Sequence, residues 1–384
     1  MQVPRIILLL AVLSLLLIGL IMVYSASSVT ALEEGTSATR QVVGQLLYAV
    51  VGIVAAFIIW RFVPYSLWIG NVIYAVWGVA LVLLILTSAM GNAEFGAQRW
   101  LTIGPINLQP SEFVKIALVL MSVRIIYDFR SGMVEPRATL IQIGLFIIMP
   151  VLIIYFTQSD LGTTLICLVG IFAVMWLGGV NPRILGVVVV VGILFMLFAI
   201  FGTGYRSGRM VYLDPWNDGE GGYGTGFNII RSYYAFAEGG LFGVGLGNSH
   251  EKFQYLFASD SDFIFAVIGE ELGLAGALLV IVLFIIVLVC GLRIAALAPD
   301  AIGTMIAGGI TTMLVFQAFL NIGCTIGVLP TTGKPLPFIS SGGSSMIASL
   351  IMVGLVLSVS AAPTGEQRRR EDLRVVRVNN APRR

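Results

Sequence analysis

The chain has 384 residues, of which 58% are hydrophobic and 11% are charged. Soluble globular proteins of this length do not have such a composition, so that class is excluded. Apolar stretches long enough to cross a bilayer recur along the sequence, and we therefore expect an all-α polytopic membrane protein. The single histidine, His250, argues against a zinc site built on histidines and against a histidine proton relay.

Ten membrane-spanning helices fit the apolar pattern. We place them at residues 6–24, 42–60, 67–88, 112–128, 138–156, 161–178, 184–204, 263–290, 301–328 and 343–361. The first has the charge pattern of a signal peptide, with Ser25, Ala26 and Ser27 as an alternative cleavage site. We expect it to be retained because so many spans follow. Residues 1–362 then form one membrane domain, with a long polar loop at about residues 205–262.

The distribution of Lys and Arg predicts the orientation, because cytoplasmic loops carry an excess of these residues. Fourteen of the 22 fall on the side of the two termini: Arg5, Arg61, Arg124, Arg130, Arg137, Arg183, Arg293, Arg368, Arg369, Arg370, Arg374, Arg377, Arg383 and Arg384. The other eight accompany most of the acidic residues on the opposite side. We therefore expect both termini in the cytoplasm and the long loop outside the cell.

Residues 363–384 form a basic tail on the cytoplasmic side. Their polar, Arg-rich composition predicts a solvated, disordered end that helps to fix the topology. Binding to a partner or to anionic lipid is the alternative.

Three carboxylates occur where the long loop ends and the next apolar run begins. We expect Asp262 at the mouth of this run, with Glu270 and Glu271 about two to three helical turns deeper at a rise of about 1.5 Å per residue. Ionisable groups at or inside a bilayer are costly, and they are therefore functional candidates. The alternative for Asp262 is a cap at the N-terminus of the helix.

Glu112 and Lys115 lie at the head of the fourth span, three residues apart and so on one helical face. Charged side chains at this position must face protein or a water-filled cavity. The pair is therefore either a structural ion pair or part of a substrate cavity. Arg99 adds a cation in the loop that precedes this helix.

Two further outer segments carry candidate residues. Asp160 lies in a tight turn before the sixth span, where it either caps the helix or contributes to the site. The segment 327–345 contains three prolines, which prevent a continuous helix. Irregular backbone at membrane depth is tolerated where it lines a cavity or is buried in protein. Lys334 is a cation in this segment, and Ser344 and Ser345 add hydroxyl groups near its end.

These residues, with Arg206 and Arg209 in the long loop, place carboxylates and cations at one face of the membrane. A carboxylate among cations suits base catalysis on a substrate that carries a diphosphate. Outside the cell there is no nucleotide sugar or ATP, so a donor used there would have to be carried by a lipid.

In its motifs the chain resembles the SEDS family (shape, elongation, division and sporulation), which includes FtsW, RodA and SpoVE. The resemblance covers nearly the whole chain. It rests on residues 99–100, 109–112 with Lys115, 158–162, 245–249, 262–266 with 270–273, and 334–345, in this order. The Gly-Gly-Ser-Ser ending of the last motif and the basic tail are most like FtsW.

The resemblance implies an inverting peptidoglycan glycosyltransferase. Its substrate would be lipid II, the undecaprenyl-diphosphate-linked disaccharide-pentapeptide, polymerised on the outer face of the bacterial cytoplasmic membrane for cell division or cell shape. Asp262 matches the family's catalytic aspartate. The substrate-binding residues that we expect are Arg99, Glu112, Lys115, Asp160, Arg206, Arg209, Lys334, Ser344 and Ser345.

The resemblance also implies partners. We expect a class B penicillin-binding protein, which is a transpeptidase, other divisome or elongasome proteins, and membrane lipid, with no nucleic acid. No cofactor is certain, and a divalent cation is left open. Two other function classes stay open as well: a lipid II flippase or transporter, for which broken segments and buried charges would be suited, and a non-catalytic division scaffold.

Overall fold

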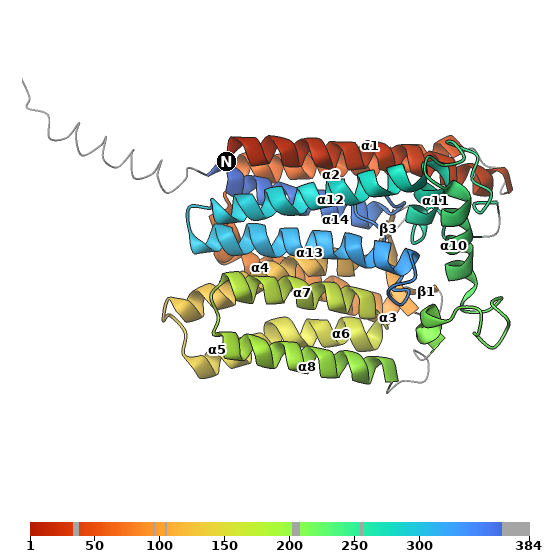
Figure 1. Cartoon of the computed structure of the whole chain (residues 1–384). Coiled ribbons are helices and arrows are strands. Elements are labelled where there is room, and N and C mark those ends of the chain that lie inside the picture. The colour runs from red at the N-terminus through yellow and green to blue at the C-terminus, as the bar shows by residue number, and fades with distance from the viewer. Residues whose placement is uncertain (34–37, 95–96, 104–105, 202–207, 254–255, 363–384) are drawn as a thin grey trace, which may run out of the picture.

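The computed structural model describes residues 1–33, 38–94, 97–103, 106–201, 208–253 and 256–362. Within these residues most helices run roughly parallel in one bundle (Figure 1). The expected helical membrane fold is therefore confirmed. The basic tail at residues 363–384 lies outside the described residues, so its disorder stays a prediction.

The elements follow one another through the bundle as two runs. The first comprises α1 (Gln2–Glu33), α2 (Ala38–Phe62), the 3₁₀ helix η1 (Tyr65–Ile69), α3 (Val72–Met90), β1 (Asn92–Glu94), β2 (Ala97–Ile103), β3 (Ile106–Leu108), α4 (Pro110–Arg130), α5 (Pro136–Ile143), the π-helical turn η2 (Gly144–Ile148), α6 (Met149–Thr157), α7 (Leu161–Leu177) and α8 (Pro182–Phe201). The second comprises η3 (Gly208–Leu213), α10 (Phe227–Gly239), α11 (Ile264–Glu271), α12 (Gly273–Ala296), α13 (Ala301–Thr325) and α14 (Gly343–Ala361).

Seven helical stretches of the described chain are long and apolar enough to cross a membrane. They are Gln2–Ser27, Thr39–Phe62, Val72–Ala89, Pro136–Thr157, Gly273–Ala296, Ala301–Thr325 and Gly343–Ala361. The other three expected spans coincide with α4, α7 and α8. Of these, α7 and the apolar part of α8 are shorter, and α4 carries charged residues at both ends. Every expected span therefore coincides with a helix, although three are atypical.

The eighth span begins later than the sequence pattern predicted. The chain turns between α11 and α12, where Gly273 has a φ of +67°. A side chain there would be strained, and its Cβ would lie 2.4 Å from the backbone nitrogen of Gly243. Glu270 and Glu271 therefore lie in a short helix, α11, that ends before the long apolar stretch Gly273–Ala296 begins, so the expected eighth span is divided into two helices.

A small antiparallel sheet, which the sequence pattern did not predict, connects α3 to α4. β2 lies between β1 and β3, with Asn92 opposite Trp100 and Leu101 opposite Leu108. Arg99 lies on this central strand. The sheet therefore holds the backbone of Arg99 in a defined position rather than in a free loop.

The core is centred on α13 and α14, whose apolar stretches are both 83% buried. α13 packs against α4, α7, α12 and α14, while α14 packs mainly against α2. Small residues allow this close approach: a Cβ at Gly309 would lie 2.5 Å from a methyl group of Val174 on α7. Polar side chains on α13 are consequently in the middle of the protein.

The segment at residues 208–262 lies at one end of the bundle, which we call the long-loop end. α10 crosses this end at a steep angle to the bundle helices (Figure 1). The start of α1 and the end of α14 lie together at the opposite end. The long loop is thus partly helical, and it covers the bundle where the candidate site residues lie.

Candidate active site

A cavity of about 220 Å³ opens at the long-loop end of the bundle. Five parts of the chain meet around it: strand β2, the start of α10, the turn before α11, the C-terminal half of α13, and residues 326–342. We call residues 326–342, which connect α13 to α14, the irregular segment. The residues that line it are Arg99, Thr225, Asn228, Asp262, Phe263, Asn321, Cys324, Thr331, Thr332, Gly333 and Lys334. The structure thus brings Arg99, Asp262 and Lys334 together from distant parts of the sequence.

Asp262 lies in the turn before α11, and its backbone carbonyl accepts a hydrogen bond from Asn321 Nδ2 at 2.9 Å. Its carboxylate has no hydrogen-bond or ion-pair partner within the part of the chain that the structure describes. Asp262 Oδ2 lies so close to Gly333 that a Cβ there would be 3.4 Å away. α11 has Phe263 at its N-cap position and no side-chain cap, so the interpretation of Asp262 as a helix cap is wrong.

The electrostatic surroundings of Asp262 are mixed. Burial raises the pKa of its carboxyl above the ordinary value, while the charges of Lys334 and Arg99 act to lower it. The neighbouring carboxylates of Asp260 and Asp160 also act to raise the pKa of Asp262. A carboxylate with a raised pKa in a cavity is a candidate proton acceptor.

Lys334 forms its ion pair with Asp160, at 2.5 Å between Nζ and Oδ2, and both side chains are buried. Asp160 is also the N-cap of α7, because it accepts hydrogen bonds from the backbone N–H and the hydroxyl of Thr163. The capping interpretation of Asp160 is therefore confirmed. It lies behind the cavity wall, where it holds Lys334 in place.

Arg99 lines the cavity from β2. Its Nε donates to the carbonyl of Gln158 at 3.1 Å, and its Nη2 donates to the carbonyl of Ser159 at 3.0 Å. These two residues form the turn just before Asp160. Burial acts to raise the pKa of Asp160, but Lys334 and Arg99 outweigh this effect and lower it to about 2. The turn before α7 thus links both cavity cations.

Glu112 and Lys115 form an ion pair at 2.9 Å, and neither side chain is exposed. Lys115 Nζ also donates to Gln317 Oε1 at 2.6 Å, and Gln317 Nε2 donates to the carbonyl of Pro335 at 3.0 Å. Glu112 Oε1 is buried and has no hydrogen-bond partner among the described residues. The structural ion pair is present, and it lies behind the irregular segment rather than among the lining residues of the cavity.

The remaining predicted substrate-binding residues do not line the cavity, or their side chains are not described by the structure. Ser344 and Ser345 are buried in the first turn of α14, and Ser344 Oγ accepts a hydrogen bond from the backbone N–H of Gln109 at 2.9 Å. Arg206 is outside the described residues, and Arg209 lies in η3, where its side chain is not described. Their substrate-binding roles stay predictions.

Three side chains on α13 carry the backbone of the irregular segment, and the sequence analysis missed them. Gln317 bonds to the carbonyl of Pro335, Asn321 Nδ2 bonds to that of Lys334 at 2.7 Å, and Cys324 bonds to that of Pro330. They are spaced i, i+4 and i+7, so they share one helical face. This spacing in an otherwise apolar helix was a signal that could have found them.

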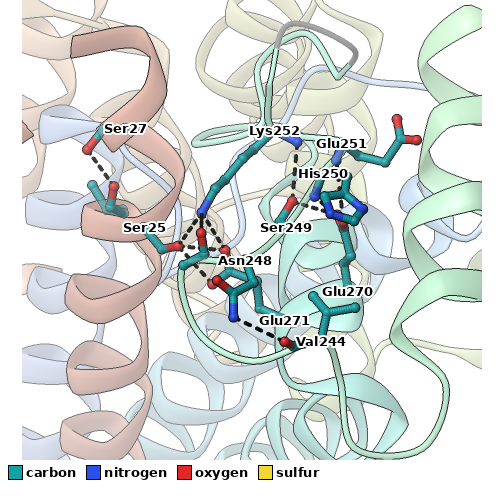
Figure 2. Close-up of polar contacts among 12 residues, drawn as sticks. Ser25, Ser27, Val244, Asn248, Ser249, His250, Glu251, Lys252, Glu270 and Glu271 are labelled. Carbon is teal, nitrogen blue, oxygen red and sulfur yellow. Dashed lines mark hydrogen bonds and ion pairs between the residues drawn. The ribbon is translucent and has the colours of Figure 1, made fainter. Parts of the chain in front are cut away.

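Glu270 and Glu271, singled out from the sequence, form a polar cluster with residues of the long loop (Figure 2), and neither lines the cavity. Glu271 accepts hydrogen bonds from Ser25 on α1 and from Lys252, whose Nζ lies 2.9 Å from it. Glu270 accepts from Ser249 at 2.6 Å and from backbone N–H groups of residues 250 and 251. These carboxylates therefore attach the long loop to α1 and α11.

The described residues include one group with the ligand types of a metal site. Ligand atoms of Glu238, His250 and Glu270 lie within 4.8 Å of one another. Glu238 and His250 are exposed, and Glu270 already accepts hydrogen bonds from Ser249 and from the backbone. None of the three residues lines the cavity, and we assign no metal to this group.

The helical bundle defines a polytopic membrane protein, with a carboxylate and two cations around a cavity at one end. The family model described as "Cell cycle protein", which covers FtsW, RodA and SpoVE, matches residues 6–364. The chain belongs to this family, the SEDS family.

Individual relatives agree with this assignment. The chain is 38% identical to a probable peptidoglycan glycosyltransferase FtsW of Geobacter metallireducens, over 94% of this chain and 95% of the relative. It is 36% identical to stage V sporulation protein E of Bacillus subtilis, over 93% and 97%. Among solved structures, a chain of a peptidoglycan synthase complex aligns with a TM-score of 0.71 at 26% identity, over 92% and 96% of the two chains. RodA of Thermus thermophilus aligns with a TM-score of 0.66 at 26% identity, over 92% and 95%.

Proposed function

We propose that this chain is a peptidoglycan glycosyltransferase that polymerises lipid II on the outer face of the bacterial cytoplasmic membrane, for cell division or cell shape. One observation carries the proposal: the Asp262 carboxylate faces a cavity without a partner among the described residues, while Arg99 and Lys334 line the same cavity. The name of the FtsW relative, a probable peptidoglycan glycosyltransferase, supports this activity.

In this proposal Asp262 is the general base. Chain growth joins the 4-hydroxyl of one sugar to the anomeric carbon of another. The O–H bond breaks, the new C–O bond forms, and the diphosphate leaves with the electron pair of the old C–O bond. The proton passes to the Asp262 carboxylate. A single displacement inverts the anomeric centre and needs one carboxylate, unlike the two of a glycoside hydrolase.

Arg99 and Lys334 would stabilise the negative charge that builds on the leaving diphosphate. Both cations are oriented before substrate arrives, Lys334 by Asp160 and Arg99 by two backbone carbonyls. Such fixed charges need little reorganisation during the reaction. A divalent cation would fit the same chemistry, because Mg²⁺ accepts one or two carboxylates together with substrate phosphates. Asp262 is the carboxylate that lines the cavity.

The orientation is part of the proposal. We place the long-loop end outside the cell and both termini in the cytoplasm, because the Lys and Arg excess lies on the side of the termini. Labelling of single cysteines with an impermeant reagent tests this: a cysteine at the exposed Tyr223 should react in intact cells, whereas one at Met133 should react after lysis. Reaction of Met133→Cys in intact cells would reverse the orientation.

The proposed partners are a class B penicillin-binding protein, other divisome or elongasome proteins, and membrane lipid. One similar solved structure is described as coordinating polymerisation and crosslinking in a peptidoglycan synthase complex, which supports a transpeptidase partner. In this proposal the cavity, with its base and cations, polymerises the glycan, and the partner chain carries out the crosslinking.

Purified chain in vesicles with labelled lipid II tests the function. We expect polymer from the native chain and none from Asp262→Asn. Movement of lipid II across the bilayer without polymer would favour a flippase. Absence of both, with partner binding intact, would favour a scaffold.

A further inference from the structure

Three aromatic side chains, Tyr223, Phe227 and Phe257, form a row that we call the aromatic platform. The rings of Tyr223 and Phe227 are stacked, with centroids 6.4 Å apart and planes 28° apart. The centroids of Phe227 and Phe257 are 5.9 Å apart. Tyr223 is 78% exposed and Phe257 is 66% exposed. Contiguous exposed apolar surface is a feature of ligand-binding grooves and interaction sites.

The aromatic platform is continuous with the edge of the cavity. Phe227 lies between Thr225 and Asn228 in the sequence, and both of those residues line the cavity. Asn228 Oδ1 also accepts a hydrogen bond from the backbone N–H of Phe257 at 3.3 Å. A molecule that leaves the cavity past Asn228 therefore meets Phe227 and Phe257 next.

The loop that carries Tyr223 is held in one conformation. The Asp218 carboxylate accepts hydrogen bonds from four backbone N–H groups, those of Glu220, Gly222, Gly224 and Gly226, at 2.8 to 3.1 Å. On the other side, the Arg231 guanidinium lies 5.0 Å from the centre of the Phe227 ring. The backbone that carries Tyr223 is thus held by hydrogen bonds, which lowers the entropic cost of binding a ligand there.

We propose that the aromatic platform binds the glycan strand as it leaves the cavity. β-Linked hexose rings present flat faces of C–H groups, which pack against aromatic rings while the hydroxyl groups at the edge stay in water. Successive sugars could cover Phe257 and Tyr223 in turn. This inference rests on the proposed function for the identity of the strand, but binding itself needs no catalysis.

Two other occupants fit the surroundings less well. A stable protein interface buries about 800 Å² on each partner, more than two exposed rings supply. A lipid surface is disfavoured by the acidic residues of the same loop, Asp214, Asp218 and Glu220. α10, which carries Phe227, also crosses the end of the bundle instead of lying along its sides (Figure 1).

The experiment measures binding and product length in parallel. The purified full-length chain is titrated with a fluorescent β-1,4-linked N-acetylglucosamine hexamer, and strands made from labelled lipid II are sized on gels. The variant is Tyr223→Ala with Phe257→Ala. The matched control is Phe242→Ala, which removes an aromatic ring that is 83% exposed and lies outside the cavity lining.

We expect the double variant to bind the hexamer about tenfold more weakly and to release shorter strands, because two stacking contacts are lost. The control should match the native chain in both measurements. Equal hexamer binding by the double variant and the native chain would overturn the inference, as would no binding by either. Loss of transpeptidase association with unchanged hexamer binding would instead identify a protein-docking surface. If the native chain binds the hexamer but makes no polymer, the proposed function fails and the glycan site remains.

Discussion

Lys334 Nζ lies 2.5 Å from Asp160 Oδ2, and this ion pair leaves Asp262 as the carboxylate that faces the cavity without a partner among the described residues. Asp160 and Asp262 therefore have different roles. Asp160 neutralises and positions a cation, whereas Asp262 is available to accept a proton. The difference arises from the turn before α7, where Asp160 is buried as a helix cap.

The pairing predicts an asymmetry between single and double variants. Lys334→Gln leaves the buried Asp160 carboxylate without its cation, which should cost about 3–5 kcal/mol of stability. Lys334→Gln combined with Asp160→Asn should recover most of that stability in thermal unfolding, because no buried charge is left alone. The double variant should still polymerise lipid II poorly, since the cavity has lost a cation. Full polymerisation activity in the double variant would show that the substrate diphosphate does not bind next to Lys334.

A second prediction concerns Glu112 and Lys115. Each single alanine variant should accumulate less than the double variant, because a lone charge remains in a region where neither side chain is exposed. The expected destabilisation is about 3–5 kcal/mol for either single variant. Normal abundance and activity of both single variants would show that the pair is dispensable. Gln317→Leu is the companion variant, because it removes the link from Lys115 to the irregular segment.

Much of the fold could be predicted from the sequence because apolar length is a local property. Helices coincide with all ten expected spans. The break at Gly273 could not be predicted, because an apolar run continues through it and only the contact with residues 241–243 requires the turn. The strands at residues 92–108 were missed for a related reason: short strands need pairing partners, which local composition does not specify.

Residues of the candidate site could be predicted where a charged side chain occurs at the end of an apolar span. Asp262, Arg99 and Lys334 were found because charged residues at a membrane boundary need an explanation. Asn321 was missed because an amide carries no charge, although its spacing from Gln317 and Cys324 on one face of an apolar helix was a usable signal. Glu270 and Glu271 were expected within one continuous span because apolar residues follow them directly, although α11 ends at Glu271 and α12 begins at Gly273.

The third prediction assigns a positioning role to Asn321. Its amide donates to the backbone carbonyls of Asp262 and Lys334, so it fixes the proposed base relative to the cation. Asn321→Leu should lower kcat by about 10²-fold, the typical effect of misplacing reacting groups by about 1 Å. The control is Thr325→Val on the same helix, whose hydroxyl bonds to the carbonyl of residue 321 and not to the cavity segments.

The kinetics separate positioning from general damage. Asn321→Leu should change kcat more than KM and should alter the pH profile, because the surroundings of Asp262 change. A variant that loses only thermal stability, with kcat and the pH profile of the native chain, would reduce Asn321 to a structural residue.

The last prediction concerns the pH dependence of polymerisation. If Asp262 is the general base, it must be deprotonated, so activity falls as pH drops through its pKa. Burial raises this pKa above the ordinary value, and the acid limb should therefore lie at a higher pH than that of an ordinary aspartate. Asp262→Asn should lower the rate by about 10²–10⁴-fold, the usual contribution of base catalysis. Asp262→Glu should retain little activity, because its carboxylate is displaced by one methylene.

Two charges near Asp262 should shift the acid limb of the pH–rate profile in opposite directions. The charge of Arg99 lowers the pKa of Asp262, whereas the charge of Asp260 raises the pKa of Asp262. Arg99→Gln should therefore move the acid limb to higher pH, and Asp260→Asn should move it to lower pH. Rates measured from saturating lipid II between about pH 4 and pH 8 give the limb for each variant, with membrane abundance as the control. An acid limb that neither substitution moves would mean that another group controls the rate, and an Asp262→Asn variant with near-native rate would leave Asp262 without a catalytic role.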